Sequence, residues 1–466
     1  MEARSLKILF LNPPGPRYLF RGSICTYLSK SHYVWKPKDF LLLSGKVQTQ
    51  TEITFLDASI NGVREPAALA RAAGENPDAV IVALSSIVWD DDMKFLRALR
   101  DLLPRTPLAV FGEVLLERPF AEAAMKYADA IIYDPLAADL GEFVRTRSVQ
   151  HDPLPSPKKV TRAVNIHVPR HELFDNIRYR WPFVKHFRYA AIYTQFGCPF
   201  MCSYCTESVT NVTYRPADNV IKELRYVKQL GYKEINIADA SFGYPRENAV
   251  NLLEAMIAER FGFSWSCYTY PGLADAAMLQ LMRRSGCHTV VIGVDSADPR
   301  LLRKYQRNLQ SERLHAFVSS CSELDIDVCG DFILGFDEDT RESCLRTIEL
   351  ALDLDLAYAS FNIATPMMGS SIREIFKAKG LLSDETGYDT AARNKIAGTG
   401  NISADELLDL RNLATRRFYF RPAYLWRRIK RVRSAEEFLI KLVEMSGIAS
   451  NWLSGRPESV LGVGRV

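Results

Sequence analysis

The sequence lacks any apolar run long enough to cross a membrane. The run from Ile8 to Leu11 is far shorter than the roughly 20 residues that a spanning helix needs, and no other stretch reaches that length. The first residues also lack the extended apolar core of a secretory signal peptide. We therefore expect a cytoplasmic protein without a transmembrane segment.

The sequence also lacks a large charge of one sign and a high density of cysteine. Its 466 residues carry a net charge of +4, which gives no reason to expect nucleic-acid binding. Nine cysteines are too few for a disulfide framework in a chain of this length. Six of them are scattered, and we expect these to be reduced core residues: Cys25, Cys267, Cys287, Cys321, Cys329 and Cys344.

The other three cysteines form one compact C-x3-C-x2-C motif at Cys198, Cys202 and Cys205. A structural zinc site normally needs four ligands, and no second cysteine pair follows the motif. Thiolates are the usual protein ligands of iron–sulfur clusters, and a four-iron cluster held by three of them keeps one iron open to a small molecule. The alternative is a set of three buried or redox-inert thiols.

A chain of this length exceeds what one hydrophobic core usually supports, so we expect two or three domains. Short apolar runs alternate with helical segments through the first 150 residues. The predicted strands are 7–11, 52–56, 79–84, 108–111 and 130–133, and the predicted helices are 66–73, 93–103 and 120–127. This alternation predicts an α/β domain with a parallel sheet wound on both faces. Ligands of such sheets bind at the carboxyl ends of the strands.

The same alternation resumes after residue 188 and gives six β/α repeats. The predicted strands are 190–195, 234–238, 264–268, 289–294, 327–334 and 358–363. Six repeats predict a partial barrel related to the closed eight-fold form. In such barrels the chemistry gathers at the carboxyl ends of the strands, and the first of these ends carries the cysteine motif.

The cysteine motif and the ends of these strands resemble the radical SAM superfamily. The resemblance implies that the three cysteines are the catalytic ligands of a [4Fe-4S] cluster whose open iron binds S-adenosylmethionine (SAM). It also implies that Tyr204 packs near the adenine of SAM. The other SAM contacts that it implies are Asp239, Ser241, Asp295 and Ser296, with Asp295 in place of the commoner glutamate.

The N-terminal segment resembles the cobalamin-binding domain of B12-dependent radical SAM enzymes, because an Asn-Pro-Pro turn follows its first strand. The stretch Asp57-x-Ser59-x-x-Gly62 corresponds to Asp-x-His-x-x-Gly, whose histidine ligates cobalt. Serine is a poor cobalt ligand, so the lower face of a cobalamin here is not expected to be held by histidine. Glu113 also stands where a second glycine is usual. The cobalamin contacts that the resemblance implies are Asn12, Pro13, Pro14, Ser59, Ser85, Ser86 and Gly112. The alternative is a flavodoxin-like domain that has lost its ligand or serves only packing.

The domain limits predicted from these patterns are 1–150 for the cobalamin-binding-like domain, 151–187 for a linker, 188–385 for the radical SAM core and 386–466 for a C-terminal helical domain. Three prolines and two lysines in 151–160 are typical of an exposed connector. The C-terminal segment is rich in arginine and aromatic residues. We expect it to pack on the barrel; binding of an anionic substrate or of a membrane surface is the alternative.

The resemblance implies an enzyme that cleaves SAM to a 5'-deoxyadenosyl radical after an external donor such as flavodoxin or ferredoxin reduces the cluster. With cobalamin, it would most often methylate an unactivated carbon of a small-molecule or lipid metabolite. One alternative is a radical SAM enzyme without cobalamin that catalyses a rearrangement or cyclisation. Another is a non-catalytic iron–sulfur protein. A methylthiotransferase fits poorly, because its N-terminal domain supplies three further cluster cysteines and only Cys25 is available here.

Overall fold

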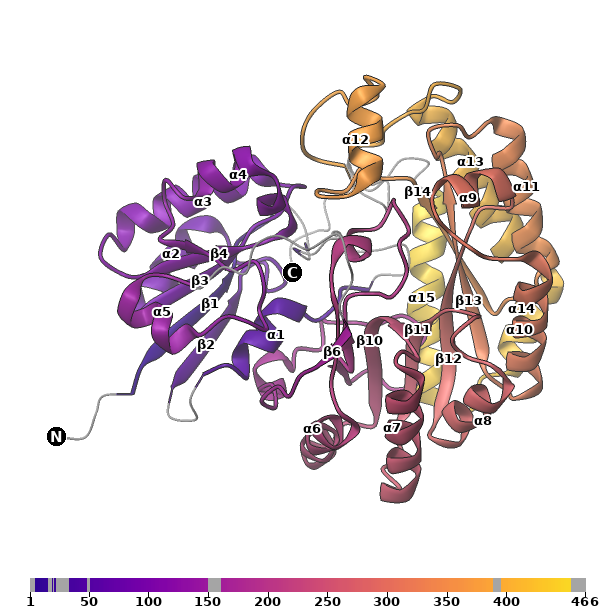
Figure 1. Ribbon diagram of the computed structural model, residues 1–466, viewed down its shortest axis with the longest axis horizontal. Helices are drawn as coiled ribbons and strands as arrows, with labels where there is room; N and C mark the ends of the chain where they lie inside the picture. The colour runs from indigo at the N-terminus through magenta and orange to yellow at the C-terminus, as the bar shows by residue number, and fades with distance from the viewer. Residues whose placement is uncertain are drawn as a thin grey trace.

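The computed structural model describes residues 5–15, 19, 21, 33–47, 51–149, 161–388 and 395–453. Two parallel β-sheets with their helices stand side by side in the molecule (Figure 1). Cys25 and the predicted connector 151–160 lie outside the described residues.

The N-terminal sheet has five parallel strands in the order β2-β1-β3-β4-β5. Leu9 and Leu11 of β1 pack with α2 and α3 on one face, whereas Ile8 and Phe10 pack with α1 and α5 on the other. This arrangement confirms the predicted sheet wound on both faces. The strands are β1 Lys7–Asn12, β2 Glu52–Asp57, β3 Ala79–Ala83, β4 Leu108–Phe111 and β5 Ala130–Ile131; the helices are α1 Lys38–Ser44, α2 Glu65–Gly74, α3 Trp89–Leu102, α4 Arg118–Ala124 and α5 Leu140–Thr146.

The second sheet has six parallel strands in the order β14-β13-β12-β11-β10-β7. Consecutive strands along the chain are neighbours in this sheet, as the predicted partial barrel requires. The strands are β7 Tyr189–Ile192, β10 Glu234–Phe242, β11 Ser264–Thr269, β12 Cys287–Asp295, β13 Asp327–Leu334 and β14 Tyr358–Ile363. The helices between them are α6 Ala217–Gln229, α7 Arg246–Glu259, α8 Ala276–Arg284, α9 Pro299–Lys304, α10 Ser311–Glu323 and α11 Arg341–Asp353. A small third sheet joins β6 Thr161–Ala163, β8 Gln195–Phe196 and β9 Val212–Tyr214.

Strand β10 is longer than predicted. We expected it to end at Ala238, but it continues to Phe242, and its pairing with β11 shifts register between Ile237 and Phe242. Such a bulge lets a strand continue while it bends and re-aims its side chains. Asp239 and Ser241 therefore lie within the end of β10 and not beyond it.

Aromatic side chains fill the lower part of the barrel interior. Trp181 donates its indole N–H to Ser266 Oγ on β11 at 2.9 Å, and its ring lies 4.9 Å from that of Trp35. The ring of Phe183 lies 4.5 Å from that of Tyr358, at the start of β14. These contacts bring segments from before the barrel against its strands β11 and β14.

Lys36 is buried beside the first barrel strand. Its Nζ lies 5.3 and 5.0 Å from the ring centres of Tyr189 and Tyr232. Burial lowers the pKa of Lys36 from 10.5 to about 7, against the opposing effect of Asp175. The unfolded chain thus binds more protons than the folded protein between about pH 7 and 10, and stability should rise with pH across this window.

We expect Lys36→Met to increase the free energy of unfolding at pH 7, by up to about 4 kcal/mol from the shift in pKa. Its advantage over the wild type should shrink as the pH approaches 10. Urea unfolding at several pH values measures this difference. The control is Lys94→Met, because the Lys94 side chain is 74% exposed. Equal pH slopes for the wild type and Lys36→Met would show that Lys36 does not cause the effect.

The carboxyl ends of the two sheets face each other through α12 (Ser371–Ala378) and the loops around it (Figure 1). The buried Arg373 of α12 forms an ion pair with Glu117, which follows β4. Gly387 donates its N–H to Ser86 O at 3.0 Å, and Met368 belongs to the hydrophobic core of the N-terminal sheet. Loops that follow β3, β4 and β14 therefore meet at one interface.

The basic C-terminal helices pack on the barrel, as predicted. These helices are α13 Ala404–Tyr419, α14 Pro422–Lys430 and α15 Ala435–Leu453. Their arginines pair with acidic residues of the barrel: Arg417 with Glu349, Arg427 with Asp355, Arg428 and Arg431 with Asp327, and Arg433 with Asp325. Among the residues that the structure describes, no helix is both long and apolar enough to span a bilayer.

Candidate functional site

The cysteine loop leaves the barrel after β7 and β8 through a glycine that the geometry requires. Gly197 has a φ of +72°, and a Cβ at this position would lie 2.0 Å from Asn211 O. No larger residue fits this turn without moving the backbone. Cys202 is buried, whereas Cys198 and Cys205 are partly exposed, and none of the three forms a disulfide.

The three cysteines do not converge on one point. Within the described ranges, no three histidine, cysteine, aspartate or glutamate side chains are grouped so as to hold a single metal ion. A four-iron cluster does not need such a grouping, since each thiolate binds an iron of its own. Cys198 and Cys202 lie close enough to act electrostatically on Cys205, whose pKa rises to about 12, mainly through burial. Three thiols on one loop thus fit a cluster better than a single zinc ion.

Arg307 connects the cysteine loop to the end of β12. Its Nη1 donates to Cys202 Sγ at 3.9 Å, and its Nε lies 2.8 Å from Asp295 Oδ2. The Tyr204 hydroxyl donates to the same Asp295 oxygen at 2.8 Å. Burial lowers the pKa of Arg307, but Asp295, Tyr204 and Cys202 more than offset this effect and raise it. Three of the predicted site residues thus meet around one guanidinium group.

Tyr204 also lies against an aromatic surface. Its ring centre is 5.5 Å from that of Phe336 and 6.2 Å from that of Tyr305. Flat apolar walls of this kind suit a planar ring system. The predicted contact of Tyr204 with an adenine fits this place.

Asp239 and Ser241 have different surroundings, although they lie two residues apart. Asp239 accepts hydrogen bonds from the backbone N–H groups of Thr194 and Gln195 at 2.7 and 3.0 Å, and burial raises its pKa to about 6. Its carboxylate therefore holds the chain just before the cysteine loop. Ser241 Oγ and Gln195 Oε1 are buried and have no hydrogen-bond partner among the described residues. Because buried polar atoms are rarely left unpaired, these two atoms are suited to a polar ligand.

The Ser296 side chain forms hydrogen bonds within the protein. Its Oγ accepts the backbone N–H of Asp298 at 3.1 Å and lies 3.5 Å from Thr347 Oγ1. The side chain is buried among these groups. The structure therefore places Ser296 at the start of α9 and gives no separate support for a contact with SAM.

At the carboxyl edge of the N-terminal sheet, Arg21 joins several predicted residues. Its guanidinium donates to Asn12 Oδ1 at 2.7 Å and forms a buried ion pair with Asp92 at 2.6 Å. Asp92 in turn accepts the backbone N–H of Ser85 at 2.9 Å. The carbonyl oxygens of Pro13 and Pro14 also accept hydrogen bonds from Arg21. Asn12, the two prolines and Ser85 therefore form one connected rim.

Ser59 stands at the histidine position of the cobalamin motif. Its Oγ accepts the backbone N–H of Leu19 at 2.9 Å. Leu19 packs in a small apolar cluster with Ile87 and Val88. The serine oxygen is thus bonded within the protein.

Gly112 and Glu113 occupy the gap between the ends of β3 and β4. A Cβ on Gly112 would lie 2.1 Å from Leu84 O, and its φ is +151°, so only glycine fits this close approach. Glu113 Oε1 accepts the N–H and hydroxyl of Ser86 at 2.9 and 2.8 Å. Glu113 Oε2 is buried and has no partner in the part of the chain that the structure describes. This oxygen needs a hydrogen-bond partner that the described residues do not supply.

Part of the sequence that contains this site also matches a known protein family. Residues 192–351 match the model of the Radical SAM superfamily. Within these residues the chain is similar to the radical SAM superfamily. The matched residues run from the end of β7 to α11 and include the cysteine loop, Asp239, Asp295 and Arg307.

Relatives and solved structures extend the likeness beyond the radical SAM domain. An uncharacterized methyltransferase of Pyrococcus horikoshii is 28% identical over 290 residues, which are 61% of this chain and 62% of that protein. The methyltransferase TsrM of Kitasatospora setae, solved with cobalamin and a [4Fe-4S] cluster, superposes with a TM-score of 0.60 at 17% identity and covers 82% of this chain and 80% of its own. The cobalamin-dependent radical enzyme OxsB superposes with a TM-score of 0.65 at 11% identity. This match covers 97% of this chain and 73% of the OxsB chain. These two structures show that the chain has the fold of cobalamin-dependent radical SAM enzymes.

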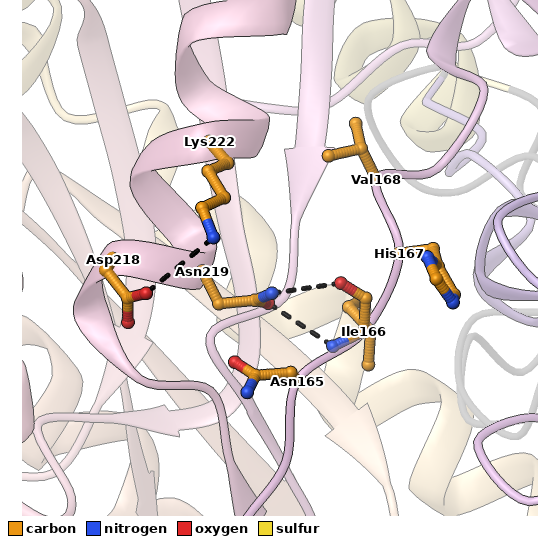
Figure 2. A pocket seen from close by; sticks show the side chains of 7 residues that line it. All are labelled: Asn165, Ile166, His167, Val168, Asp218, Asn219 and Lys222. Atoms are coloured by element: carbon orange, nitrogen blue, oxygen red, sulfur yellow. Dashed lines mark hydrogen bonds and ion pairs between the residues drawn. The ribbon is translucent and has the colours of Figure 1, made fainter.

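A pocket of about 410 Å³ lies away from the residues of the radical SAM site. It is formed by residues 165–168 and the first two turns of α6, as Figure 2 shows. Asn219 fixes one wall, because its side-chain amide bonds both to the carbonyl and to the N–H of Ile166. None of the predicted site residues lines this pocket.

Sequence reasoning did not predict roles for Arg21, Glu113 or Arg307. Arg307 lies 105 residues from the cysteine that it contacts, and Glu113 lies 27 residues from Ser86. Neither belongs to a spaced motif. The one available signal was Glu113 itself, a charged residue where the family pattern has glycine.

Proposed function

We propose that the protein is a cobalamin-dependent radical SAM methyltransferase that acts on an unactivated carbon of a small-molecule or lipid metabolite. The observation that carries this proposal is the cysteine motif at the mouth of a radical SAM barrel whose carboxyl ends face those of a cobalamin-type sheet. We also propose a cytoplasmic location and an external one-electron donor of the flavodoxin or ferredoxin type.

In this proposal Cys198, Cys202 and Cys205 hold the [4Fe-4S] cluster. Tyr204 bounds the space for the adenine, and Ser241 Oγ offers a buried hydrogen bond to SAM. Asp295 stays an ion-pair partner of Arg307, and Asp239 holds the chain before the cysteine loop. When bound, the cluster and SAM supply a 5'-deoxyadenosyl radical, and cobalamin supplies the methyl group. The protein positions these groups.

The rim formed by Asn12, Pro13, Pro14, Ser85, Ser86 and Gly112 would hold the cobalamin. The support from this chain is Glu113 Oε2, a buried oxygen beside Ser86 that lacks a partner among the described residues. The periphery of cobalamin carries amide groups that can bond to such an atom. The Ser59 hydroxyl oxygen already accepts a hydrogen bond from the Leu19 N–H. We therefore propose that Ser59 does not ligate the lower face of the cobalamin.

We expect Glu113→Ala to weaken cobalamin binding about tenfold, the cost of one buried hydrogen bond to an acidic group. A spectroscopic titration of the purified protein with hydroxocobalamin measures the dissociation constant. Glu122→Ala is the matched control, since the Glu122 side chain is 62% exposed and pairs only with Arg118 among the described residues. Equal affinities for Glu113→Ala and the wild type would remove Glu113 from the binding site.

Anaerobic reconstitution tests the proposal as a whole. The protein is loaded with iron and sulfide, its absorption is recorded with and without added cobalamin, and 5'-deoxyadenosine is measured after SAM and a strong reductant are supplied. A cluster spectrum with no retained corrinoid would reject the cobalamin part. An intact cluster that yields no 5'-deoxyadenosine would favour a non-catalytic iron–sulfur protein.

A further inference from the structure

The Arg307 side chain contacts Cys202, a cysteine of the motif. Its Nη1 lies 3.9 Å from Cys202 Sγ, within hydrogen-bonding range of sulfur. Both side chains are nearly buried: Cys202 is 7% exposed and the Arg307 side chain is 10% exposed. In such surroundings a charge is screened weakly, so one guanidinium has a large effect on its neighbour.

Several contacts aim this guanidinium at Cys202. Its Nη2 donates to Gly293 O, its Nε faces Asp295, and its centre lies 4.8 Å above the ring of Tyr270. A Cβ at residue 293 would lie 2.8 Å from Nη2, so glycine leaves room for the guanidinium. Tyr270 covers one face of the guanidinium, Gly293 and Asp295 lie beside Nη2 and Nε, and Nη1 is turned to the sulfur.

We propose that Arg307 raises the reduction potential of the cluster by donating a hydrogen bond and placing positive charge at its Cys202 ligand. This inference rests on the proposed function, because it presupposes that the cysteine motif holds a cluster. Hydrogen bonds to ligand sulfurs and nearby charge are established determinants of cluster potential. Reduction adds one electron from an external low-potential donor and lowers the cluster charge from 2+ to 1+. No proton moves, and a cation near the sulfur favours the more negative state.

Asp295 reduces the net positive charge that Arg307 places near Cys202. Its carboxylate pairs with Arg307 and so offsets part of the positive charge, while the Tyr204 hydroxyl donates to the same oxygen and disperses part of the negative charge. The pair therefore acts mainly through the hydrogen bond of Nη1. The same contacts couple Tyr204, at the predicted adenine site, to a ligand of the cluster.

A potentiometric titration monitored by EPR tests the proposal on reconstituted protein. We expect Arg307→Gln to lower the ratio of reduced to oxidised cluster at least tenfold at a fixed potential, which corresponds to a midpoint about 59 mV lower for one electron. Arg307→Lys should shift the midpoint less in the same direction, because one ammonium cannot bond to Asp295, Gly293 and Cys202 together. Arg300→Gln is the control, since that side chain is 79% exposed on α9.

A fully loaded Arg307→Gln protein with the midpoint of the wild type would overturn the proposal. If Arg307→Gln does not retain its cluster, Arg307→Lys decides in the same way. Failure of the wild type itself to take up a cluster is a separate outcome. It would reject the proposed function, and the inference about Arg307 with it.

Discussion

Cys202→Ala is expected to yield a folded protein that holds no stable cluster and does not cleave SAM. A three-thiolate site has no spare ligand, so loss of one should cost more than the 10- to 100-fold effect of losing a residue that only supports a ligand. Iron content, the visible absorption of the reconstituted protein and 5'-deoxyadenosine formation measure the loss. Each should fall to background.

The control for this prediction is Cys321→Ala. Cys321 is fully buried in α10 and belongs to the hydrophobic core of the barrel. Its loss should cost about 1 kcal/mol of stability, as for an ordinary core substitution, and should leave the iron content unchanged. If Cys202→Ala kept its iron and Cys321→Ala lost it, the assignment of the motif would be wrong.

Arg373→Met is expected to cause the largest loss of stability among the proposed substitutions. Arg373 is 1% exposed, and its guanidinium pairs with Glu117 of the N-terminal domain and bonds to Glu385 at 2.8 Å. Removing one member of a buried ion pair costs roughly 3–5 kcal/mol, because the partner charge stays buried. Lys377 still neutralises part of the Glu117 charge at 3.1 Å, so we expect about 3 kcal/mol.

Urea unfolding measures this loss, and hydrogen exchange locates it. Exchange should accelerate at residues 113–117 and 385–388, where the two domains meet. Arg118→Met is the control, because its ion pair with Glu122 lies on an exposed helix face and such pairs contribute less than about 1 kcal/mol. A loss below 1 kcal/mol for Arg373→Met, with unchanged exchange, would show that this ion pair does not hold the domains together.

The strands could be predicted because their signal is local. All five residues of β3 are buried, and a short apolar run of this kind between two helical segments favours a central parallel strand. The same reasoning correctly placed β13 and β14 to the residue. It did not place the end of β10, since the bulge after Ile237 depends on its pairing with β11.

The site residues could be predicted only where they lie close together in the sequence. The cysteine motif and Tyr204 lie within eight residues of one another, so one loop brings them together. Arg307 reaches that loop from a segment after α9, and no local pattern could indicate this. Asp239 shows the opposite case. Its residue type suggested a ligand contact, but the N–H groups of Thr194 and Gln195 bond to one of its oxygens and the Thr194 hydroxyl bonds to the other.

The position of α15 makes its contacts with the two edges of the barrel late events during synthesis. Glu436 and Glu444 of α15 accept the backbone N–H groups of Phe187 and Phe183, just before β7, while Lys441 lies 5.1 Å from the ring centre of Tyr358 at the start of β14. Figure 1 shows this helix running along the strands of the six-stranded sheet. The first and last strands of the barrel are thus joined by residues translated more than 240 positions after β7. Domains begin to fold as they leave the ribosome. The contact between Phe183 and Tyr358 can form first, and the bonds that α15 adds to both edges can form only when residues 435–453 have emerged.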